Sequence, residues 1–439
     1  MRVSVIGCGH LGIPHAAAMA ELGHEVIGVD VDQAKVDRLN AGECPIYEIG
    51  LPELLARHTA SGRLRFTTDI REASDFAELH FIGVGTPSTP TAAPTTPHRS
   101  TARSANSPPP RPTVHDRREE HGHRRHHQPG HRPRPAPGPA GKSVEVVWNP
   151  EFLREGHAVQ DTLRPDRLIA GVTTSEGEKA IRAVYAGIID AGVPIFVTDP
   201  QTAELAKGAA NTFLGLKISY INAVADMCET AGGDVSQIVD ILGIDPRIGS
   251  GGMQPGIGYG GGCLPKDVRA FTASARQLGT EQAAALLRAA EVINENRTDV
   301  ALGLITRALG DRPIKGARLT VWGAAFKPGT NDVRESPALA LAHALQQAGA
   351  TVTIHDPQAV ATAMVRNPEF DYTDDLPASL DGADAVVLAT EWPEYRHTDP
   401  QALAGRPANP LLVDCRTTLD PEPWRTAGWT VHQLGRPGK

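Results

Sequence analysis

The N-terminal segment contains a glycine pattern that restricts this part of the chain to one kind of α/β fold. Arg2 to Gly7 reads RVSVIG, a β-branched run typical of a buried strand, and it leads directly into GCGHLG. An alanine-rich helical segment follows, and then a second apolar run that ends at Asp30. Strand, G-x-G-x-x-G, helix, strand and acid together form the context in which a dinucleotide is bound. The sequence therefore predicts a doubly wound, parallel α/β sheet at the N-terminus.

The residues of this pattern have separate expected roles. Gly7 permits the tight turn after the strand, Gly9 lets the backbone approach the pyrophosphate, and Gly12 allows the helix to pack closely on the strand. Asp30 lies at the end of the second strand, where its carboxylate accepts hydrogen bonds from the adenosine ribose and repels a 2′-phosphate. We therefore expect NAD rather than NADP. A glycine-rich turn that binds nothing is the alternative interpretation.

Another apolar run, Leu79–Val84, predicts a further buried strand. It ends in Gly85-Thr86-Pro87, and we expect this loop to lie beside the phosphates or the ribose, with Thr86 as a binding residue.

Residues 87–141 differ in composition from the rest of the chain. They hold 13 of the 36 prolines and 7 of the 17 histidines, and Val114 is their only large apolar residue. So little apolar surface cannot offset a backbone entropy cost of roughly 1–2 kcal/mol per residue. We expect this segment to be disordered and to form no strand. Binding of nucleic acid or an anionic surface by its arginines is one alternative. Binding of a metal is another, with candidate ligands His121, His123, His126, His127 and His131.

The positive charge of residues 87–141 makes the whole chain look less acidic than the rest of it is. It carries a net charge of +6, so the rest of the chain carries −14, which argues against nucleic-acid binding. The N-terminus lacks the pattern of a signal peptide, and no apolar run reaches the ~20 residues of a membrane span. Five scattered cysteines indicate thiols in a reducing compartment. We expect a cytoplasmic protein with no nucleic-acid, membrane or metal partner.

Two carboxylates and a long helical pattern follow the anomalous segment. Glu151 and Glu155 in NPEFLREG share one helical face if their turn is helical, although such pairs are usually solvated. The pattern from Thr202 to Ala231 predicts a long helix. Lys207 and Asn211 lie one helical turn apart on its surface. Its apolar stripe indicates core or a dimer interface and comprises Leu205, Ala209, Phe213, Leu216 and Tyr220.

The stretch from Gly249 to Asp267 contains eight glycines. Such density excludes a regular element and indicates a loop that wraps a ligand with its backbone. The stretch ends in CLPKD, where Pro265 is well placed as the first residue of a helix. The helix N-terminus and Lys266 both favour the thiolate of Cys263, and Asp267, one turn later, can hold a water. This spacing predicts a nucleophile with an attendant base, the alternative being a buried structural cysteine.

The C-terminal third contains four further candidates for buried strands, ARLTVWGAAFKPGT, ATVTIHDP, ADAVVLAT and LLVDC. Their alternation with helical patterns predicts a second doubly wound unit. The expected fold is therefore α/β, with two doubly wound Rossmann-like domains joined by a long central helix. The expected boundaries are 1–86 and 142–200 for the first domain, interrupted by 87–141, then 201–300 for a central helical domain and 301–439 for the C-terminal domain.

Taken together, the motifs resemble the UDP-glucose/GDP-mannose dehydrogenase family. The resemblance covers 1–86 and 142 to the end, and it is carried by GCGHLG, PIYEIGL, GTP, NPEFLREG, ELAKGAANTFL, DPRIG, GYGGGCLPKD and WGAAFKPGTNDVRESP. It implies that the C6 alcohol of a nucleotide-sugar is oxidised to a carboxylate by two hydride transfers to NAD. It also implies that the C-terminal domain binds the nucleotide diphosphate and that the central helix forms a homodimer.

The resemblance implies roles for single residues. Cys263 would attack the C6 aldehyde to give a thiohemiacetal and then a thioester, and Asp267 would act with a water as base. Lys207 and Asn211 would stabilise the oxyanion, and Glu151 would position the hydrolytic water. Arg247 would reach into the site of the partner subunit. Further cofactor contacts would come from Lys35, Glu155, Lys266 and Arg334. Further substrate contacts would come from Phe152, Leu153, Tyr259, Gly260, Gly261 and Lys327.

Several alternatives stay open. The motifs favour UDP-glucose, with GDP-mannose and other UDP-sugars as alternatives. Family members carry a strand and a loop with a catalytic threonine where this chain has 87–141. A second alternative is therefore an inactive protein that binds a nucleotide-sugar without turnover. Two compensating frameshifts near residues 87 and 141 would explain the Arg-, Pro- and His-rich text. A simple two-electron dehydrogenase is opposed by Cys263, because single alcohol oxidation needs no thiol.

Overall fold

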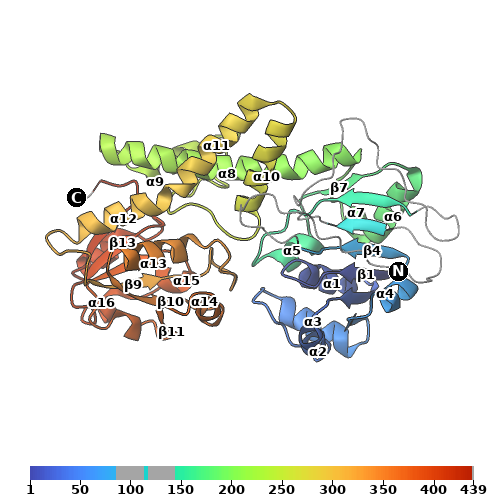
Figure 1. Ribbon diagram of the computed structural model, residues 1–439, viewed down its shortest axis with the longest axis horizontal. Coiled ribbons are helices and arrows are strands. Elements are labelled where there is room, and N and C mark those ends of the chain that lie inside the picture. Colours follow the sequence, from blue (N-terminus) through green and yellow to red (C-terminus); the bar gives the residue numbers. More distant parts are fainter. Residues whose placement is uncertain (86–112, 117–143, 438–439) are drawn as a thin grey trace, which may run out of the picture. The chain divides into compact units, whose positions relative to one another are not determined.

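The structure is a computed structural model that describes residues 1–85 and 144–437 and, for the backbone, 113–116. Contacts within the chain divide it into two compact units. We call Met1–Lys207 the N-terminal unit and Gly208–Lys439 the C-terminal unit. Both combine mainly parallel sheets with helices, and Figure 1 labels their elements.

The first sheet of the N-terminal unit is parallel and has the strand order β3-β2-β1-β4. The central strand β1 (Arg2–Ile6) pairs with β2 (Glu25–Val29) on one side and with β4 (Leu79–Ile82) on the other. This is the order of the first half of a dinucleotide-binding fold, as the sequence predicts. The remaining elements before the anomalous segment are α1 (Gly12–Glu21), α2 (Gln33–Asn40), α3 (Leu51–Ala60), β3 (Leu64–Thr67) and α4 (Ile70–Phe76).

A second sheet in this unit has the order β5-β6-β7-β8 and includes a strand from the anomalous segment. β5 (Thr113–Asp116) pairs in parallel with β6 (Val146–Asn149). The expectation that 87–141 forms no strand is therefore wrong at these four positions. Ladder hydrogen bonds use backbone groups, so a short segment with β-branched Thr and Val can add an edge strand without a hydrophobic pattern. The rest of 87–141, including the histidine candidates and the expected disorder, lies outside the described residues.

The unit is completed by alternating helices and strands. These are α5 (Ala158–Leu163), β7 (Leu168–Gly171), α6 (Ser175–Val184), α7 (Ala186–Asp190) and β8 (Ile195–Thr198). β7 and β8 are parallel, whereas β6 and β7 are antiparallel. Buried side chains from both sheets share one core cluster, which contains Val5, Phe81 and Leu168, whereas Ile27 and Val29 of β2 belong to a smaller cluster.

The C-terminal unit contains a six-stranded parallel sheet with the order β11-β10-β9-β12-β13-β14. Counted from β9, this is 3-2-1-4-5-6, the full order of a doubly wound dinucleotide-type fold. The four strands predicted here are confirmed as β9 (Arg318–Trp322), β10 (Thr351–His355), β12 (Ala385–Leu388) and β13 (Leu411–Asp414). The sequence does not predict the two edge strands, β11 (Asp371–Thr373) and β14 (Thr430–Gln433).

Helices cover this sheet and build the segment before it. Helix α13 (Pro337–Gln347) contacts β10, and α12 (Arg297–Ala308) contacts β13 (Figure 1). The predicted long helix is confirmed as α8 (Pro200–Ala231), which continues across the boundary between the two units. The other helical elements are α9 (Val235–Ile244), α10 (Leu264–Gln277), α11 (Glu281–Glu295), α14 (Val360–Arg366), a 3-10 turn (Ala378–Leu380), α15 (Pro393–Arg396), α16 (Pro400–Leu403) and α17 (Pro421–Thr426).

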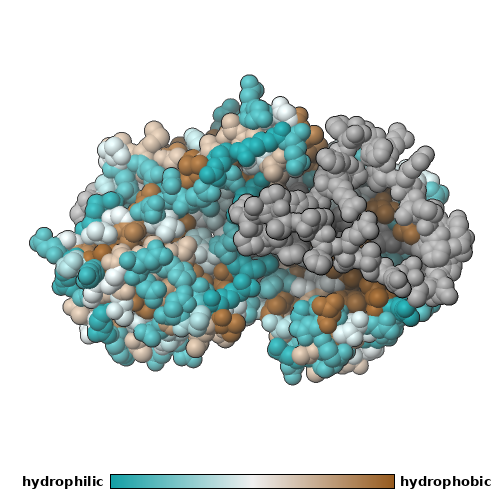
Figure 2. All heavy atoms as spheres, viewed as in Figure 1, coloured by the Kyte–Doolittle hydropathy of each residue, from teal (hydrophilic) through white to brown (hydrophobic). Residues whose placement is uncertain are grey.

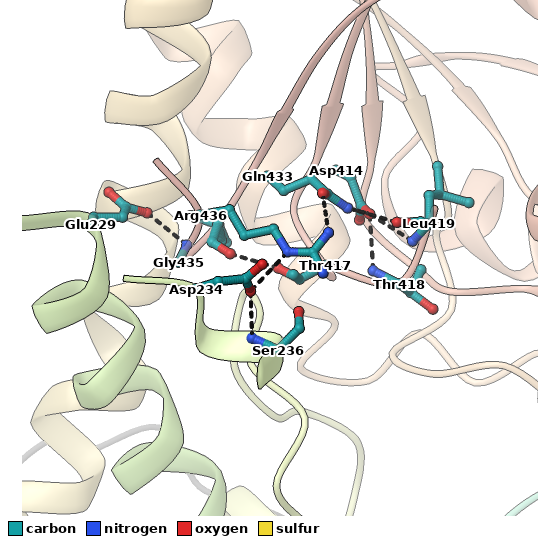
Figure 3. Close-up of polar contacts among 11 residues, drawn as sticks. Glu229, Asp234, Ser236, Asp414, Thr417, Thr418, Leu419, Gln433, Gly435 and Arg436 are labelled. Carbon is teal, nitrogen blue, oxygen red and sulfur yellow. Dashed lines mark hydrogen bonds and ion pairs between the residues drawn. The ribbon is translucent and has the colours of Figure 1, made fainter. Parts of the chain in front are cut away.

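After β14 the chain returns to the helices that precede the sheet. The carbonyl of Gly435 accepts a hydrogen bond from the Val235 N–H of α9 (3.1 Å), and the Gly435 N–H donates to Glu229 Oε1 of α8 (2.9 Å). Arg436 Nε donates to Oδ1 of Asp234 (3.0 Å), whose carboxylate also caps α9. Figure 3 shows the contacts of Gly435 with Glu229 and of Arg436 with Asp234. We call residues 434–436 the C-terminal clasp because they attach the end of the sheet to α8 and α9.

The apolar stripe predicted on α8 is not part of this chain's core. Leu205 is 49%, Phe213 62% and Tyr220 58% exposed. Hydrophilic residues cover much of the visible face of the C-terminal unit in Figure 2, with hydrophobic residues scattered among them. In the described part of the chain, no helix combines the length and apolar character needed to cross a membrane.

Candidate active site

The glycine loop after β1 has the geometry that the sequence predicts. Gly7 has φ +100°, which an L side chain rarely adopts. A Cβ on Gly12 would lie 1.9 Å from the Gly7 carbonyl oxygen, so only glycine lets α1 approach β1 this closely. A Cβ on Gly9, by contrast, would meet no described atom within 4 Å. The tight turn and the close packing are confirmed, and Gly9 faces open space.

The N-terminus of α1, next to the open space at Gly9, is suited to binding an anionic group. The N-cap residue Leu11 makes no side-chain cap, and the first turn of α1 contains no acidic residue. Helix N–H groups and the positive end of the helix dipole bind anions. The loop and the helix terminus therefore fit the pyrophosphate of a dinucleotide.

Asp30 lies directly after β2 and is buried. Its Oδ1 accepts a hydrogen bond from the Asp32 N–H (3.1 Å), and its Oδ2 forms an ion pair with Lys35 Nζ (2.9 Å). The structure thus brings together two predicted cofactor residues, Asp30 and Lys35. Burial, helped by the nearby Asp30 charge, raises the pKa of the Cys8 thiol to about 12, so this cysteine of the loop stays a protonated core residue.

Glu151 and Lys207 form a second group in the N-terminal unit. Lys207 Nζ donates to Glu151 Oε1 (3.1 Å) and lies 5.3 Å from the centre of the Phe152 ring. Arg167 also contacts this ring, with its Cζ 3.9 Å from the same centre. The Leu153 N–H donates to Glu151 Oε2. A buried carboxylate, two cations and an aromatic ring therefore meet just after the end of β6.

The turn that carries these residues is not helical. Residues 150–157 form a loop, so the condition under which Glu151 and Glu155 would share a helical face is not met. The loop is instead held by Glu48, whose two carboxylate oxygens accept hydrogen bonds from the Gly156 N–H (2.7 Å) and the Ala158 N–H (2.8 Å). Because a buried carboxylate satisfies the loop's backbone, no helix is needed there. Glu155 is buried in the same loop.

Cys263 is the N-cap residue of α10 and is half-buried. Pro265 is the second residue of this helix rather than the first. All five cysteines lie in the described residues, and none forms a disulfide. Burial raises the pKa of the other four thiols, Cys8, Cys44, Cys228 and Cys415. Among these five, Cys263 is the thiol at the positive end of a helix, where a thiolate is stabilised.

Asp267 lies one turn after Cys263 and is buried. Its N–H donates to the Cys263 carbonyl (2.9 Å), its Oδ2 accepts from Asn211 Nδ2 (2.6 Å), and its Oδ1 lies 3.8 Å from Lys266 Nζ. The predicted residues Cys263, Asp267, Asn211 and Lys266 are therefore brought together. A thiol and a fixed carboxylate in one helical turn can perform nucleophilic catalysis with a general base.

The glycines before Cys263 are required by the loop that follows β9. A Cβ on Gly260 would lie 2.0 Å from the Glu335 carbonyl oxygen, and one on Gly261 would lie 2.7 Å from the Phe326 ring. A Cβ on Gly262 would lie 2.5 Å from Cζ of Arg334. The Gly261 N–H also donates to the Arg334 carbonyl (3.0 Å). The predicted residues Gly260, Gly261 and Arg334 therefore lie together.

The remaining predicted residues are placed as follows. Lys327 is half-buried, with Nζ 5.7 Å from the centre of the Phe326 ring. Burial, with the nearby Glu291 charge, raises the pKa of Tyr259 to about 12. The Arg247 side chain is 86% exposed and forms an ion pair with Asp245 (2.6 Å). Thr86 lies outside the described residues. In the described ranges, no group of three or more His, Cys, Asp or Glu side chains is arranged to hold a metal.

Sequence reasoning missed several polar residues that hold these loops. They are Glu48, Arg167, Asn222, Asn294, Arg297 and Arg416. Glu48 could have been found, because it lies in PIYEIGL, one of the motifs that carry the family resemblance. The others are single polar residues in helices or loops with no local pattern, and their partners are distant in sequence.

Comparison with known proteins gives family matches in both units. The chain matches the NAD binding domain of the UDP-glucose/GDP-mannose dehydrogenase family at residues 1–105 and 124–189. It matches the central domain of this family at 201–296 and the UDP binding domain at 320–421. The first match is interrupted inside the anomalous segment.

Similar proteins agree over the whole chain. A UDP-glucose 6-dehydrogenase of Rhizobium meliloti is 36% identical, with 100% of both chains covered. A UDP-glucose 6-dehydrogenase of Haloferax volcanii is 37% identical, covering 95% of this chain and 96% of that protein. The solved structure of a UDP-glucose dehydrogenase from Pyrobaculum islandicum is 31% identical with a TM-score of 0.81, and 99% of this chain and 98% of that chain are covered. With the three domain matches, these similarities show that the chain belongs to the UDP-glucose/GDP-mannose dehydrogenase family.

Proposed function

We propose that this protein is an NAD-dependent UDP-glucose 6-dehydrogenase, which converts the C6 alcohol of UDP-glucose to a carboxylate and consumes one water. The observation that carries the proposal is Cys263 at the start of α10, one turn from Asp267, whose carboxylate is held by Asn211. A nucleophile that forms a covalent intermediate assists the oxidation of an aldehyde to an acid, whereas oxidation of an alcohol alone has no step that uses one. The names of the similar proteins from Rhizobium meliloti and Haloferax volcanii support the same substrate.

The residues of this chain have defined tasks in the proposed reaction. NAD held at the glycine loop after β1 would supply the hydride acceptor for each of the two oxidations. Asp267, through a water, removes the C6 hydroxyl proton as the alcohol becomes an aldehyde. The Cys263 thiolate then adds to the aldehyde carbon, forming a C–S bond and an oxyanion. Lys207 and Asn211, one turn apart on α8, are proposed as donors to that oxyanion.

The acid is released in the final steps. Loss of a hydride from the thiohemiacetal leaves a thioester on Cys263. A water positioned by Glu151 adds to the thioester carbon, and the C–S bond breaks to release the carboxylate and restore the thiol. Glu151 is suited to orienting a water because its carboxylate is itself fixed by Lys207 and by the Leu153 N–H.

Cofactor and substrate contacts follow from the same assignment. NAD would be held at Gly7, Gly9 and Gly12, with Asp30 and Lys35 at the ribose. Glu155, Lys266 and Arg334 are proposed near the cofactor and the reacting carbon, with Thr86 as a further cofactor residue. The nucleotide-sugar would be bound by Phe152, Leu153, Tyr259, Gly260, Gly261 and Lys327. The exposed faces of Leu205, Phe213 and Tyr220 on α8 support a homodimer, in which exposed Arg247 reaches the partner's site.

The test uses the purified full chain with NAD and a panel of nucleotide-sugars. We expect NADH release and a uronate product with UDP-glucose, and slower or no turnover with GDP-mannose and N-acetylated UDP-sugars. Five thiols without a disulfide suit a cytoplasmic enzyme, so the assay is run under reducing conditions. Binding of UDP-glucose without NADH release would indicate the inactive alternative and direct attention to residues 87–141.

A further inference from the structure

The loop that leads to Cys263 is held by side chains of three different helices. Between Gly249 and Cys263 the described backbone forms no helix or strand, so its polar groups need other partners. Asn222 of α8 accepts a hydrogen bond from the Gly256 N–H (2.8 Å), and Arg297 Nε of α12 donates to the Gly256 carbonyl (2.9 Å). The N–H and the carbonyl of Gly256 are thus both satisfied by buried side chains. The third helix, α11, contributes Asn294, which contacts Tyr259.

The Asn294 side chain forms hydrogen bonds with both backbone polar groups of Tyr259, as a paired β-strand would. Its Oδ1 accepts from the Tyr259 N–H (2.8 Å), and its Nδ2 donates to the Tyr259 carbonyl (3.1 Å). Gly258 makes this approach possible, because a Cβ there would lie 2.4 Å from Asn294 Oδ1. Gly258 also has φ +86°, which a side chain would strain. The Asn294 side chain can therefore reach Tyr259 only because residue 258 is glycine, and this contact lies four residues before Cys263.

The burial of Arg297 is energetically unfavourable, and its side chain is retained for the hydrogen bond that it donates to the loop. It is 1% exposed, and its Nη1 pairs with Asp226 Oδ1 of α8 (2.6 Å). Its Nη2 is buried with no hydrogen-bond partner among the described residues. A buried guanidinium with an unsatisfied N–H is destabilising relative to an apolar side chain. What the arginine provides and an apolar residue cannot is the donor to the Gly256 carbonyl.

Asn294 and Arg297 lie close together in sequence, where α11 meets α12. Because both hold the same loop, we propose that they are positioning residues that fix residues 256–259 and so set the position of the Cys263 thiol. Their relevance to turnover rests on the proposed function. Their action on the loop does not, because it is a property of the resting protein.

The experiment compares Asn294→Ala with Asn294→Asp, and uses Asn296→Ala, an exposed asparagine two positions later, as the matched control. Hydrogen exchange of the Tyr259 amide and the rate of alkylation of Cys263 by iodoacetamide are measured on the full chain. We expect Asn294→Ala to raise amide exchange about tenfold, which corresponds to the loss of one hydrogen-bonded contact. We expect it also to change the alkylation rate several-fold, with the protein still folded and its melting temperature lowered by only a few degrees. Asn294→Asp, which keeps the acceptor, should retain most of the amide protection, and Asn296→Ala should match the wild type.

A second variant, Arg297→Lys, keeps the charge beside Asp226 but not the planar donor to Gly256, and it should also change the alkylation rate. With UDP-glucose and NAD, Asn294→Ala should lower kcat about tenfold, because a reacting group is misplaced. The KM for UDP-glucose should rise by a smaller factor, since Tyr259 is proposed to contact the sugar. Wild-type exchange and wild-type alkylation in both Asn294→Ala and Arg297→Lys would overturn the proposal. Altered exchange and alkylation in a protein that releases no NADH would support the positioning role and refute only the proposed function.

Discussion

Asn211 donates a 2.6 Å hydrogen bond from Nδ2 to Oδ2 of Asp267, which joins the long helix α8 to the first turn of α10. Both side chains are buried. One carboxylate oxygen of Asp267 is thereby fixed, and the carboxylate is held one turn from the Cys263 thiol. The pair defines the chemistry available at the start of α10.

Asp267→Asn removes the proposed base while keeping the size of the side chain. We expect kcat with UDP-glucose to fall by about 10²–10⁴, the usual contribution of general base catalysis. The exposed Asp311→Asn is the control, and it should retain wild-type kcat. A loss of less than about tenfold in Asp267→Asn, with intact folding by circular dichroism, would remove Asp267 from the mechanism.

Asp30→Ala tests the choice of cofactor. The change removes the acceptor proposed for the ribose hydroxyls and leaves the Lys35 ammonium without its 2.9 Å ion-pair partner. The KM for NAD should rise about tenfold, because a charge-assisted contact is lost. The ratio of kcat/KM for NADP to that for NAD should rise as well, since Lys35 can face a 2′-phosphate. The exposed Asp37→Ala on α2 should change neither value, and an unaltered ratio in Asp30→Ala would show that Asp30 does not read the ribose.

Gly435 and Gly428 provide a matched pair for the C-terminal clasp. Both have positive φ, +70° and +89°, so alanine is strained at either. At Gly428 a Cβ meets no described atom within 4 Å, whereas at Gly435 it would lie 2.5 Å from Val235 Cγ1. Gly428→Ala should therefore lower the free energy of unfolding by about 1 kcal/mol and Gly435→Ala by about 2–4 kcal/mol. Equal losses in urea unfolding would mean that the clasp does not hold the sheet to α8 and α9.

The buried histidines make stability depend on pH in a defined direction. Burial lowers the pKa of His355 from its ordinary value of 6.5, and its Nδ1 lies 2.9 Å from the Tyr395 hydroxyl. Protonation below pH 6.5 therefore favours the unfolded chain, so stability is full above that pH and is lost as pH falls through the lowered value. We expect urea midpoints, followed by tryptophan fluorescence, to fall as the pH is lowered from above to below that value. His355→Gln should reduce this fall, and the exposed His397→Gln should not; equal slopes in all three proteins would exclude His355 as the cause.

Most of the fold was predictable because its signals are local. The strand β1, the glycine turn and Asp30 lie close together in the sequence and follow one strand–turn–helix–strand pattern, and the central strands β9, β10, β12 and β13 are largely apolar runs. The edge strands β11 and β14 are short and partly polar, so their sequence does not distinguish them from loops. β5 depends on backbone pairing with β6, which no hydrophobic pattern reports.

The site was predictable where residues lie one turn apart and not where they meet from distant segments. Cys263 and Asp267 follow from helix spacing at a glycine loop. Glu48 contacts the Gly156 and Ala158 N–H groups from a distant part of the sequence. Asn294 and Arg297 likewise act on a loop far from them in sequence. Such contacts exist only after the chain has folded, so no spacing reveals them.

The role of Cys263 in a four-electron oxidation is tested most directly by the number of NADH molecules released per UDP-glucose consumed, measured for the wild-type protein and for Cys263→Ala. We expect two NADH and one uronate per sugar for the wild type, and no uronate for Cys263→Ala. One NADH per sugar with an aldehyde product in the wild type, or undiminished uronate formation by Cys263→Ala, would contradict the covalent mechanism.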